Sequence, residues 1–291
     1  MRILLLAVLM ISSGLQTSCG GNFFKDLSTK DTDAAKYEDA LKAIDLGDYA
    51  SAITHIESMS TTAKAKTKTI ETWAGAYAGK CGLNFISLIS GLGGSSGAPF
   101  LFFMQAFTAV AVDPESCYIA QQKMELLGNA SQRTSDQNLF MFVLGISKLG
   151  TYLKASADLL PATGVGGDGV ADPTFSACAN QPAPGTPMMT DAQINQVVTG
   201  LGLIFDNLAA VSSSLSGSSA VAGLDGFKAT CETLTGIPNC AITNPNGAEI
   251  TDATRLIFRE LIQTSDFGIG TACTMAQLGL PDGFGGTQCC P

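Results

Sequence analysis

Apolar residues recur at helical spacing along most of the chain, and no convincing run of alternating strand positions occurs. Residues 34–57 contain two short apolar stripes, separated by a break at Leu46, Gly47 and Asp48. A connection of this length places two consecutive helices side by side and antiparallel. The pattern therefore predicts a mostly α protein that begins with a helical hairpin.

The clearest amphipathic pattern lies in residues 136–160, where apolar residues recur every three or four positions. Lys148, Thr151 and Asp158 fall on the other side of this predicted helix. We expect that polar side to face solvent. Pro161 then ends the helix, because proline cannot continue it.

Residues 100–112 lack a polar side altogether. As a helix they would extend about 20 Å, which is too short to cross a hydrocarbon core. One interpretation is a helix buried on all sides in the centre of the fold. The other is that Phe100, Phe103 and Phe107 line a cavity for an apolar ligand or touch a membrane.

The chain opens with Arg2 and an unbroken apolar stretch from Ile3 to Ile11, followed by small and polar residues up to Cys19. This order is typical of a secretory signal, and the stretch is about half as long as a membrane-spanning helix. Small residues before a cysteine that precedes glycine resemble the lipobox of bacterial lipoproteins, although Gln16 stands where that family usually has leucine. The resemblance implies that Cys19 is lipidated and that the protein is sorted to the outer membrane.

The cysteine count fits an exported protein. There are nine cysteines, so lipidation of Cys19 leaves eight, two before residue 160 and six after it. Each part can then form its own disulfides in an oxidising compartment, although free buried thiols are the alternative. Cys81 with Cys117 and Cys231 with Cys240 are the predicted local pairs. Four cysteines remain: Cys178, Cys273, Cys289 and Cys290. We expect structural disulfides among them rather than a redox pair formed by the adjacent cysteines at 289–290.

The segment GDYASAI, residues 47–53, is similar to the turn and second-helix start of a tetratricopeptide repeat. Ala40 and Ala52 stand at the small positions where paired helices of that family approach closely, and Ala74 and Tyr77 resemble a second, degraded unit. No fixed period of 34 residues continues beyond this region. Lipoproteins of the TRAP-transporter T-component type also combine a lipid anchor with cryptic repeats, and the chain resembles them in architecture only.

These observations predict an irregular helical bundle or short solenoid with TPR-like hairpins and disulfide-stapled loops in its C-terminal half. The chain divides into a lipoprotein signal peptide at 1–18, a tether at 19–33, a TPR-like helical region at 34–160, a Gly/Pro-rich loop at 161–190 and a C-terminal helical, cysteine-rich region at 191–291.

Charge and motif content argue against nucleic-acid binding and catalysis. Without Arg2 the chain has 15 basic and 25 acidic residues, and its sequence contains no basic patch with interleaved aromatic residues. His55 is the only histidine, which removes most acid-base and metal constellations. The GGSSG and GVGGDG segments lack the strands that hydrolase and dinucleotide motifs require. We therefore expect no enzyme activity, no cofactor, no metal and no nucleic-acid partner.

The sequence thus predicts an outer-membrane lipoprotein that faces the periplasm and acts by binding. In the first hypothesis, the concave side of the 34–92 helices holds a protein partner and includes Tyr49, Trp73 and Tyr77. In the second, an apolar small molecule is bound between the 83–112 helices and the 136–160 helix, in association with a transport system. An enclosed cavity at the phenylalanines would favour the second hypothesis, and a filled interior with an exposed groove the first.

Overall fold

The computed structural model describes residues 31–86, 88, 98–108, 110–159, 167–178, 188–212, 224, 228–229, 231–232, 240–271, 273–278 and 289–290. Cys19, the predicted signal peptide, most of the predicted tether and parts of the 161–190 segment lie outside these ranges. The named helices are α2 (Asp33–Asp45), α3 (Tyr49–Glu57), α4 (Thr61–Lys64), α5 (Thr67–Cys81), α7 (Pro99–Gln105), α8 (Pro114–Glu125), α9 (Ser135–Ala157), α10 (Asp191–Ser212) and α12 (Asp252–Gln263).

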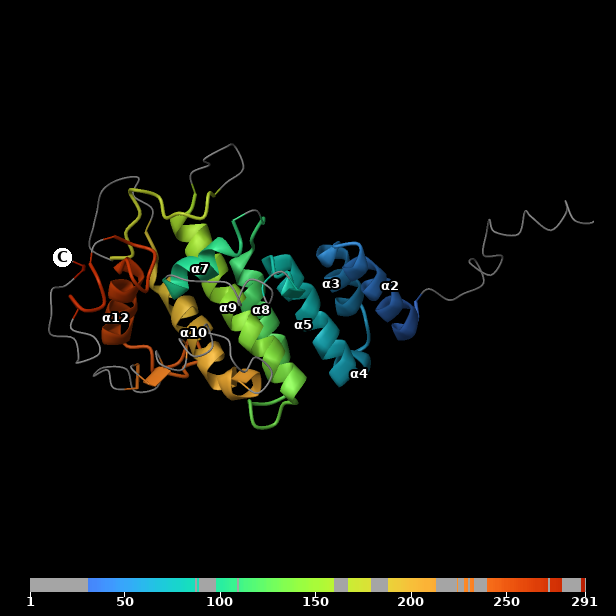
Figure 1. Ribbon diagram of the computed structural model, residues 1–291. Helices are drawn as coiled ribbons and strands as arrows, with labels where there is room; N and C mark the ends of the chain where they lie inside the picture. Colours follow the sequence, from blue (N-terminus) through green and yellow to red (C-terminus); the bar gives the residue numbers. More distant parts are fainter. Residues whose placement is uncertain are drawn as a thin grey trace, which may run out of the picture.

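Helices make up the regular structure of the described ranges, beside two isolated bridges that pair Ser176 with Met188 and Thr264 with Cys273. The predicted mostly α class is confirmed. The α2–α5 helices lie at one end of the molecule and α12 lies at the other (Figure 1). The helices α7 to α10 form the middle.

The predicted hairpin is formed by α2 and α3. Gly47 adopts a φ of +74°, a left-handed conformation that glycine accepts without a Cβ clash, and reverses the chain. The Asp48 carboxylate accepts a hydrogen bond from the Ser51 N–H at 3.1 Å and so caps α3. Ala40 and Ala52 are fully buried between the helices, as their small size predicts.

The centre of the fold is the pair α9 and α10, which approach closely at two glycines. A Cβ built on Gly145 would lie 2.8 Å from the Gly200 carbonyl oxygen, and one on Gly200 would lie 3.1 Å from the Gly145 oxygen. The helices predicted on either side of the 161–190 loop therefore share one core, which also includes side chains of α7 and α12.

The expectation of a solvent-facing side on α9 is wrong. Lys148, Thr151 and Asp158 are all buried, because α7, α8 and α10 cover α9 on several sides. The three polar groups are paired inside the protein. The Asp158 carboxylate, for example, accepts hydrogen bonds from the Asp168 and Gly169 N–H groups at 2.8 and 3.0 Å.

The apolar segment 100–112 is not one long helix, because α7 ends at Gln105. The chain turns there around the buried ammonium group of Lys154, whose Nζ donates to the carbonyl oxygens of Phe107, Thr108 and Val110 at 2.6, 3.0 and 2.7 Å. These bonds satisfy carbonyls that a continued helix would have paired within itself. Phe100, Phe103, Met104 and Phe107 nevertheless enter the core. Gln105 and Ala106 are exposed, so the segment is not buried on all sides as the first interpretation expected.

Four disulfides join the eight cysteines beyond residue 80. Cys81–Cys117 links α5 to α8, and Cys231–Cys240 closes a short loop, so both predicted local pairs are confirmed. Cys178–Cys290 and Cys273–Cys289 tie the chain end to earlier segments. Each half of the chain pairs internally, as predicted.

Candidate functional site

The three aromatic residues predicted to hold a partner are each half-buried in contacts between helices. The Tyr49 ring occupies the space beside Gly79 of α5. The Trp73 ring lies under Lys123, with Nζ 3.6 Å from the ring centroid. The Tyr77 hydroxyl donates to Glu57 Oε1 at 2.9 Å, and burial together with this carboxylate raises the pKa of Tyr77 to about 12. These contacts join α3, α5 and α8, so a partner would meet only the remaining exposed parts of the rings.

A cavity of about 240 Å³ lies between α2, α4 and α5, and none of these three aromatic residues lines it; we call it the α2–α5 groove. Its apolar lining consists of the Tyr37 ring and the buried side chains of Met59 and Ala63. Charges of both signs lie around it, from exposed Lys66, Lys68 and Glu38 and from half-buried Asp33. The Tyr37 hydroxyl is hydrogen-bonded to Thr72 Oγ1 at 2.8 Å, which fixes the ring. Sequence analysis expected a binding face on the 34–92 helices but named none of these lining residues, because three separate elements contribute them.

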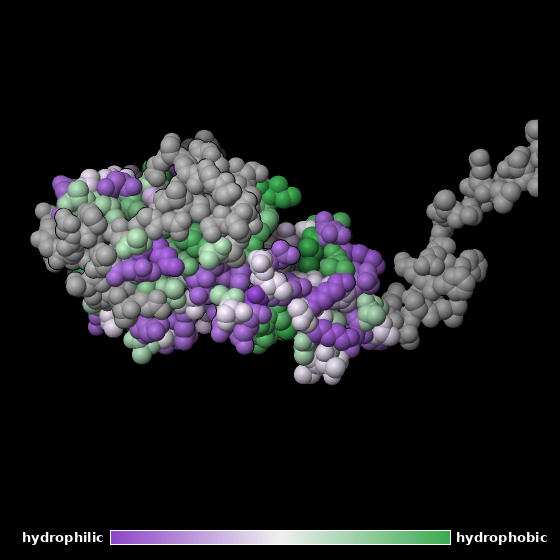
Figure 2. All heavy atoms as spheres, turned by 60° about the horizontal axis from the view of Figure 1, so that its bottom comes forward, coloured by the Kyte–Doolittle hydropathy of each residue, from purple (hydrophilic) through white to green (hydrophobic). Residues whose placement is uncertain are grey.

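On the face in Figure 2, the outside of the α2–α5 helices is mostly hydrophilic, and apolar surface gathers toward their junction with the larger part of the molecule. The α2–α5 groove has an apolar lining of three side chains, those of Tyr37, Met59 and Ala63, with charged residues around it. Such small apolar areas with charged edges suit the recognition of a single side chain rather than a large permanent interface.

The phenylalanines predicted to line a ligand cavity are packed instead. Phe100, Phe103, Phe107 and Phe142 are buried in full or nearly so, and the Phe100 and Phe267 rings lie 4.8 Å apart. A Cβ built on Gly150 would lie within 2.8 Å of the Phe107 ring. The interior at this position is therefore filled by protein atoms.

Sequence reasoning also missed a buried polar cluster around Lys148. The Lys148 Nζ donates to Gln121 Oε1 at 2.7 Å and to Thr199 Oγ1 at 2.6 Å, which connects α8, α9 and α10. Gln121 in turn donates to the Thr243 carbonyl at 2.7 Å. Burial lowers the pKa of Lys148 to about 7, while the charges of Glu125 and Glu115 act in the opposite direction. The helical periodicity of the sequence assigns Lys148 to the polar side of its helix, so the sequence alone predicts that the side chain is exposed.

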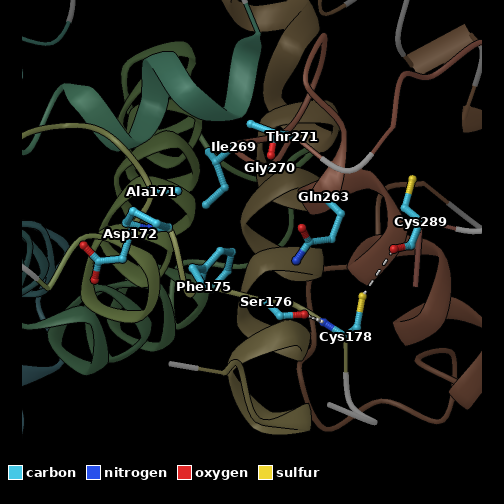
Figure 3. Close-up of a pocket in the computed structure, with 11 residues that line it drawn as sticks. Ala171, Asp172, Phe175, Ser176, Cys178, Gln263, Ile269, Gly270, Thr271 and Cys289 are labelled. Carbon is cyan, nitrogen blue, oxygen red and sulfur yellow. Dashed lines mark hydrogen bonds between the residues drawn. The ribbon is translucent and has the colours of Figure 1, made fainter. Parts of the chain in front are cut away.

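A second cavity, of about 290 Å³, lies in the disulfide-linked C-terminal part; we call it the cap cavity (Figure 3). Phe175 and Ile269 supply apolar lining, Ser176 and Gln263 supply polar groups, and Cys178 and Cys289 stand at one side. In Figure 3 the Gln263 side chain points toward the space between Phe175 and Ser176. Its Nε2 is buried and has no hydrogen-bond partner.

Two consecutive charged residues of α12 hold the segments around the cap cavity. The Arg259 guanidinium donates to the carbonyl oxygens of Ala177 and Met189 and, at 2.8 Å, to Asp191 Oδ1. The Glu260 carboxylate accepts from the N–H groups of Cys289 and Cys290 at 2.6 and 3.0 Å. Burial raises the pKa of Glu260, and the two N–H bonds oppose that rise. Both residues are buried, so the cavity has a fixed frame.

Comparisons with protein-family models, curated proteins and solved structures found no match to this chain. The lipobox and repeat resemblances therefore rest on the residues alone. Among the residues that the structure describes, no group of three or more His, Cys, Asp or Glu side chains could hold a metal ion. No helix in the same ranges is long and apolar enough to cross a membrane.

Proposed function

We propose that this protein is an outer-membrane lipoprotein, anchored through Cys19 and facing the periplasm, which acts as a non-enzymatic helical scaffold for a protein partner. The α2–α5 groove is the proposed contact site, where Tyr37, Met59 and Ala63 would receive an apolar side chain of a partner segment. The observation that carries the proposal is this groove on an exposed helical end, in a protein whose phenylalanine-rich interior is filled.

The chemistry of the groove suits a polypeptide. Its apolar floor can bury one side chain. Lys66 and Lys68, which share the lining with Asp33 and Glu38, can donate to acidic side chains or backbone carbonyl oxygens of the same segment. The packed phenylalanines leave the alternative, an apolar-ligand carrier with a cavity between the 83–112 helices and α9, without a binding space at Phe100, Phe103 and Phe142.

The position of the groove fits a lipid anchor. Asp33, at the start of α2, accepts hydrogen bonds from the Ser60 N–H and hydroxyl at 2.7 and 2.6 Å, so α4 and the groove lie where the tether enters the fold. Asp31 lies twelve positions after Cys19, which allows an extended reach of about 40 Å. A partner in the groove would therefore stay close to the membrane surface.

The anchor is tested by Cys19→Ser. We expect the wild-type protein in the outer-membrane fraction with a mass that includes acyl chains, and the variant in the soluble periplasmic fraction, because one side chain carries the whole attachment. Fractionation and mass spectrometry of both proteins provide the measurement. Membrane retention of the variant, or an unacylated wild-type mass, would contradict the anchor.

The groove is tested by a photo-crosslinking amino acid placed at Ala34, an exposed residue of its lining, in the lipidated protein in cells. We expect one discrete adduct that is reduced at least about fivefold by Lys66→Glu with Lys68→Glu, since charge reversal at the edge repels the same segment. The crosslinker at exposed Ser265, on the far end, is the control. An equal adduct from Ser265, or one that ignores the charge reversal, would rule out the groove as the contact site.

A further inference from the structure

We propose that the cap cavity binds a small, neutral molecule with an apolar body and one carbonyl group. Its volume of about 290 Å³ is close to the lower end of the range for small-molecule sites, and its lining combines the apolar side chains of Phe175 and Ile269 with polar groups such as those of Ser176 and Gln263. The cavity lies by α12, at the opposite end of the molecule from the α2–α5 groove (Figure 1), so it is a site separate from the proposed partner contact.

Gln263 identifies the polar contact. Gln263 is 6% exposed and lines the cavity, and its buried Nε2 has no hydrogen-bond partner among the residues that the structure describes. A buried donor of this kind is unfavourable unless an acceptor from outside the chain completes it. A carbonyl oxygen is the simplest group that accepts from an amide and carries no charge.

The charge in the lining explains why the ligand is neutral. Asp172 lines the cavity, but its carboxylate points away from Gln263 in Figure 3 and accepts a hydrogen bond from the Leu159 N–H at 3.0 Å. None of the described residues that line the cavity is basic, so an anion would gain no ion pair from them. The walls opposite Gln263 are the apolar groups of Phe175 and Ile269.

The frame of the cavity is fixed before a ligand arrives. The Cys178–Cys290 and Cys273–Cys289 disulfides tie its walls together, and buried Arg259 holds the segment before Cys178 through the Ala177 carbonyl. Binding would therefore require little loss of conformational entropy in the site, which favours the binding of small molecules that make few contacts.

The test compares two probes of nearly equal shape, acetophenone and ethylbenzene, by NMR of the ¹⁵N-labelled, oxidised full-length protein. We expect acetophenone to shift the side-chain amide resonances of Gln263 saturably, with an affinity at least about tenfold above that of ethylbenzene, which corresponds to one hydrogen bond. The Gln263 resonances are identified by their loss in Gln263→Met.

Two variants separate the site from general effects. Gln263→Met should bind both probes with equal affinity, and Ala171→Phe, which fills the cavity but keeps the amide, should bind neither. Absence of a saturable shift with acetophenone, equal affinities for the two probes in the wild type, or unchanged binding in Ala171→Phe would each overturn the proposal. The second variant keeps the test decisive if Gln263→Met does not fold.

Discussion

Lys148→Met is expected to remove a rise of about 4 kcal/mol in the free energy of unfolding that the wild-type protein shows between pH 7 and pH 10.5. The cause is the complete burial of the Lys148 ammonium group, which lowers its pKa from 10.5 to about 7 in the folded protein. In the unfolded chain the group is solvated and keeps its ordinary value.

The sign follows from proton binding. Between pH 7 and pH 10.5 the unfolded chain holds a proton on Lys148 that the folded protein lacks, so raising the pH stabilises the folded state by up to about 1.4 kcal/mol per unit. Below pH 7 both states are protonated and the contribution becomes constant. Glu125 and Glu115 of α8 favour the charged form, and burial outweighs them.

Urea unfolding at several pH values, with disulfides intact, provides the measurement. Lys42→Met is the matched control, because the Lys42 side chain is 71% exposed and its loss should leave the pH slope unchanged. Lys148→Met also leaves Gln121 Oε1 without its hydrogen-bond donor. This loss lowers the free energy of unfolding by the same amount at every pH, so it does not change the slope of that free energy against pH. Equal slopes in the wild type and Lys148→Met would show that the group stays charged in the folded protein.

Gly202→Ala is expected to destabilise the protein by about 3 kcal/mol or more. A Cβ at this position of α10 would overlap the Ile242 carbonyl group, with the carbonyl carbon only 2.5 Å away. The obstacle is backbone rather than a side chain that could rotate, and the segment is held by the Cys231–Cys240 disulfide. The new methyl group can therefore fit only if α10 moves away from residues 240–243.

A graded series of glycine substitutions tests this explanation. Gly75→Ala in α5 meets open space and should stabilise the protein by about 0.5–1 kcal/mol, the usual gain of alanine in a helix. Gly200→Ala, with backbone contacts at 3.1 Å, should cost less than Gly202→Ala. Thermal or denaturant unfolding gives the order. A Gly202 variant as stable as the Gly75 variant would mean that the α10 contact is loose.

Local signals gave the helical class and the first hairpin. Gly47 and Asp48 predict a turn followed by a helix cap, and the structure has both at these residues. The Cys231–Cys240 disulfide could also be predicted, because the two cysteines are only nine positions apart. The Cys81–Cys117 disulfide could be predicted because these are the two cysteines that remain before residue 160 once Cys19 is assigned to lipid. In each case the interacting groups are close in sequence or few in number.

The same reasoning failed for α9, where Lys148, Thr151 and Asp158 were assigned to solvent. The candidate sites show the same limit. The α2–α5 groove draws on three helical elements, and the cap cavity joins residues 171–178 to residues 263–271 and Cys289. The groove lining is spread over residues 33–69 and the cavity lining over residues 171–289, so neither is contained in a single helix or turn.

The sequence by itself determined the helical class, the hairpin and two disulfides, since helical periodicity, turn chemistry and cysteine spacing act over short distances along the chain. Only the tertiary structure decided that α9 is enclosed, that α7 stops at Gln105, and that Gln263 faces a cavity without a partner. The physical reason is that periodicity groups residues onto the faces of a helix, whereas the exposure of each face depends on which distant helices pack against it.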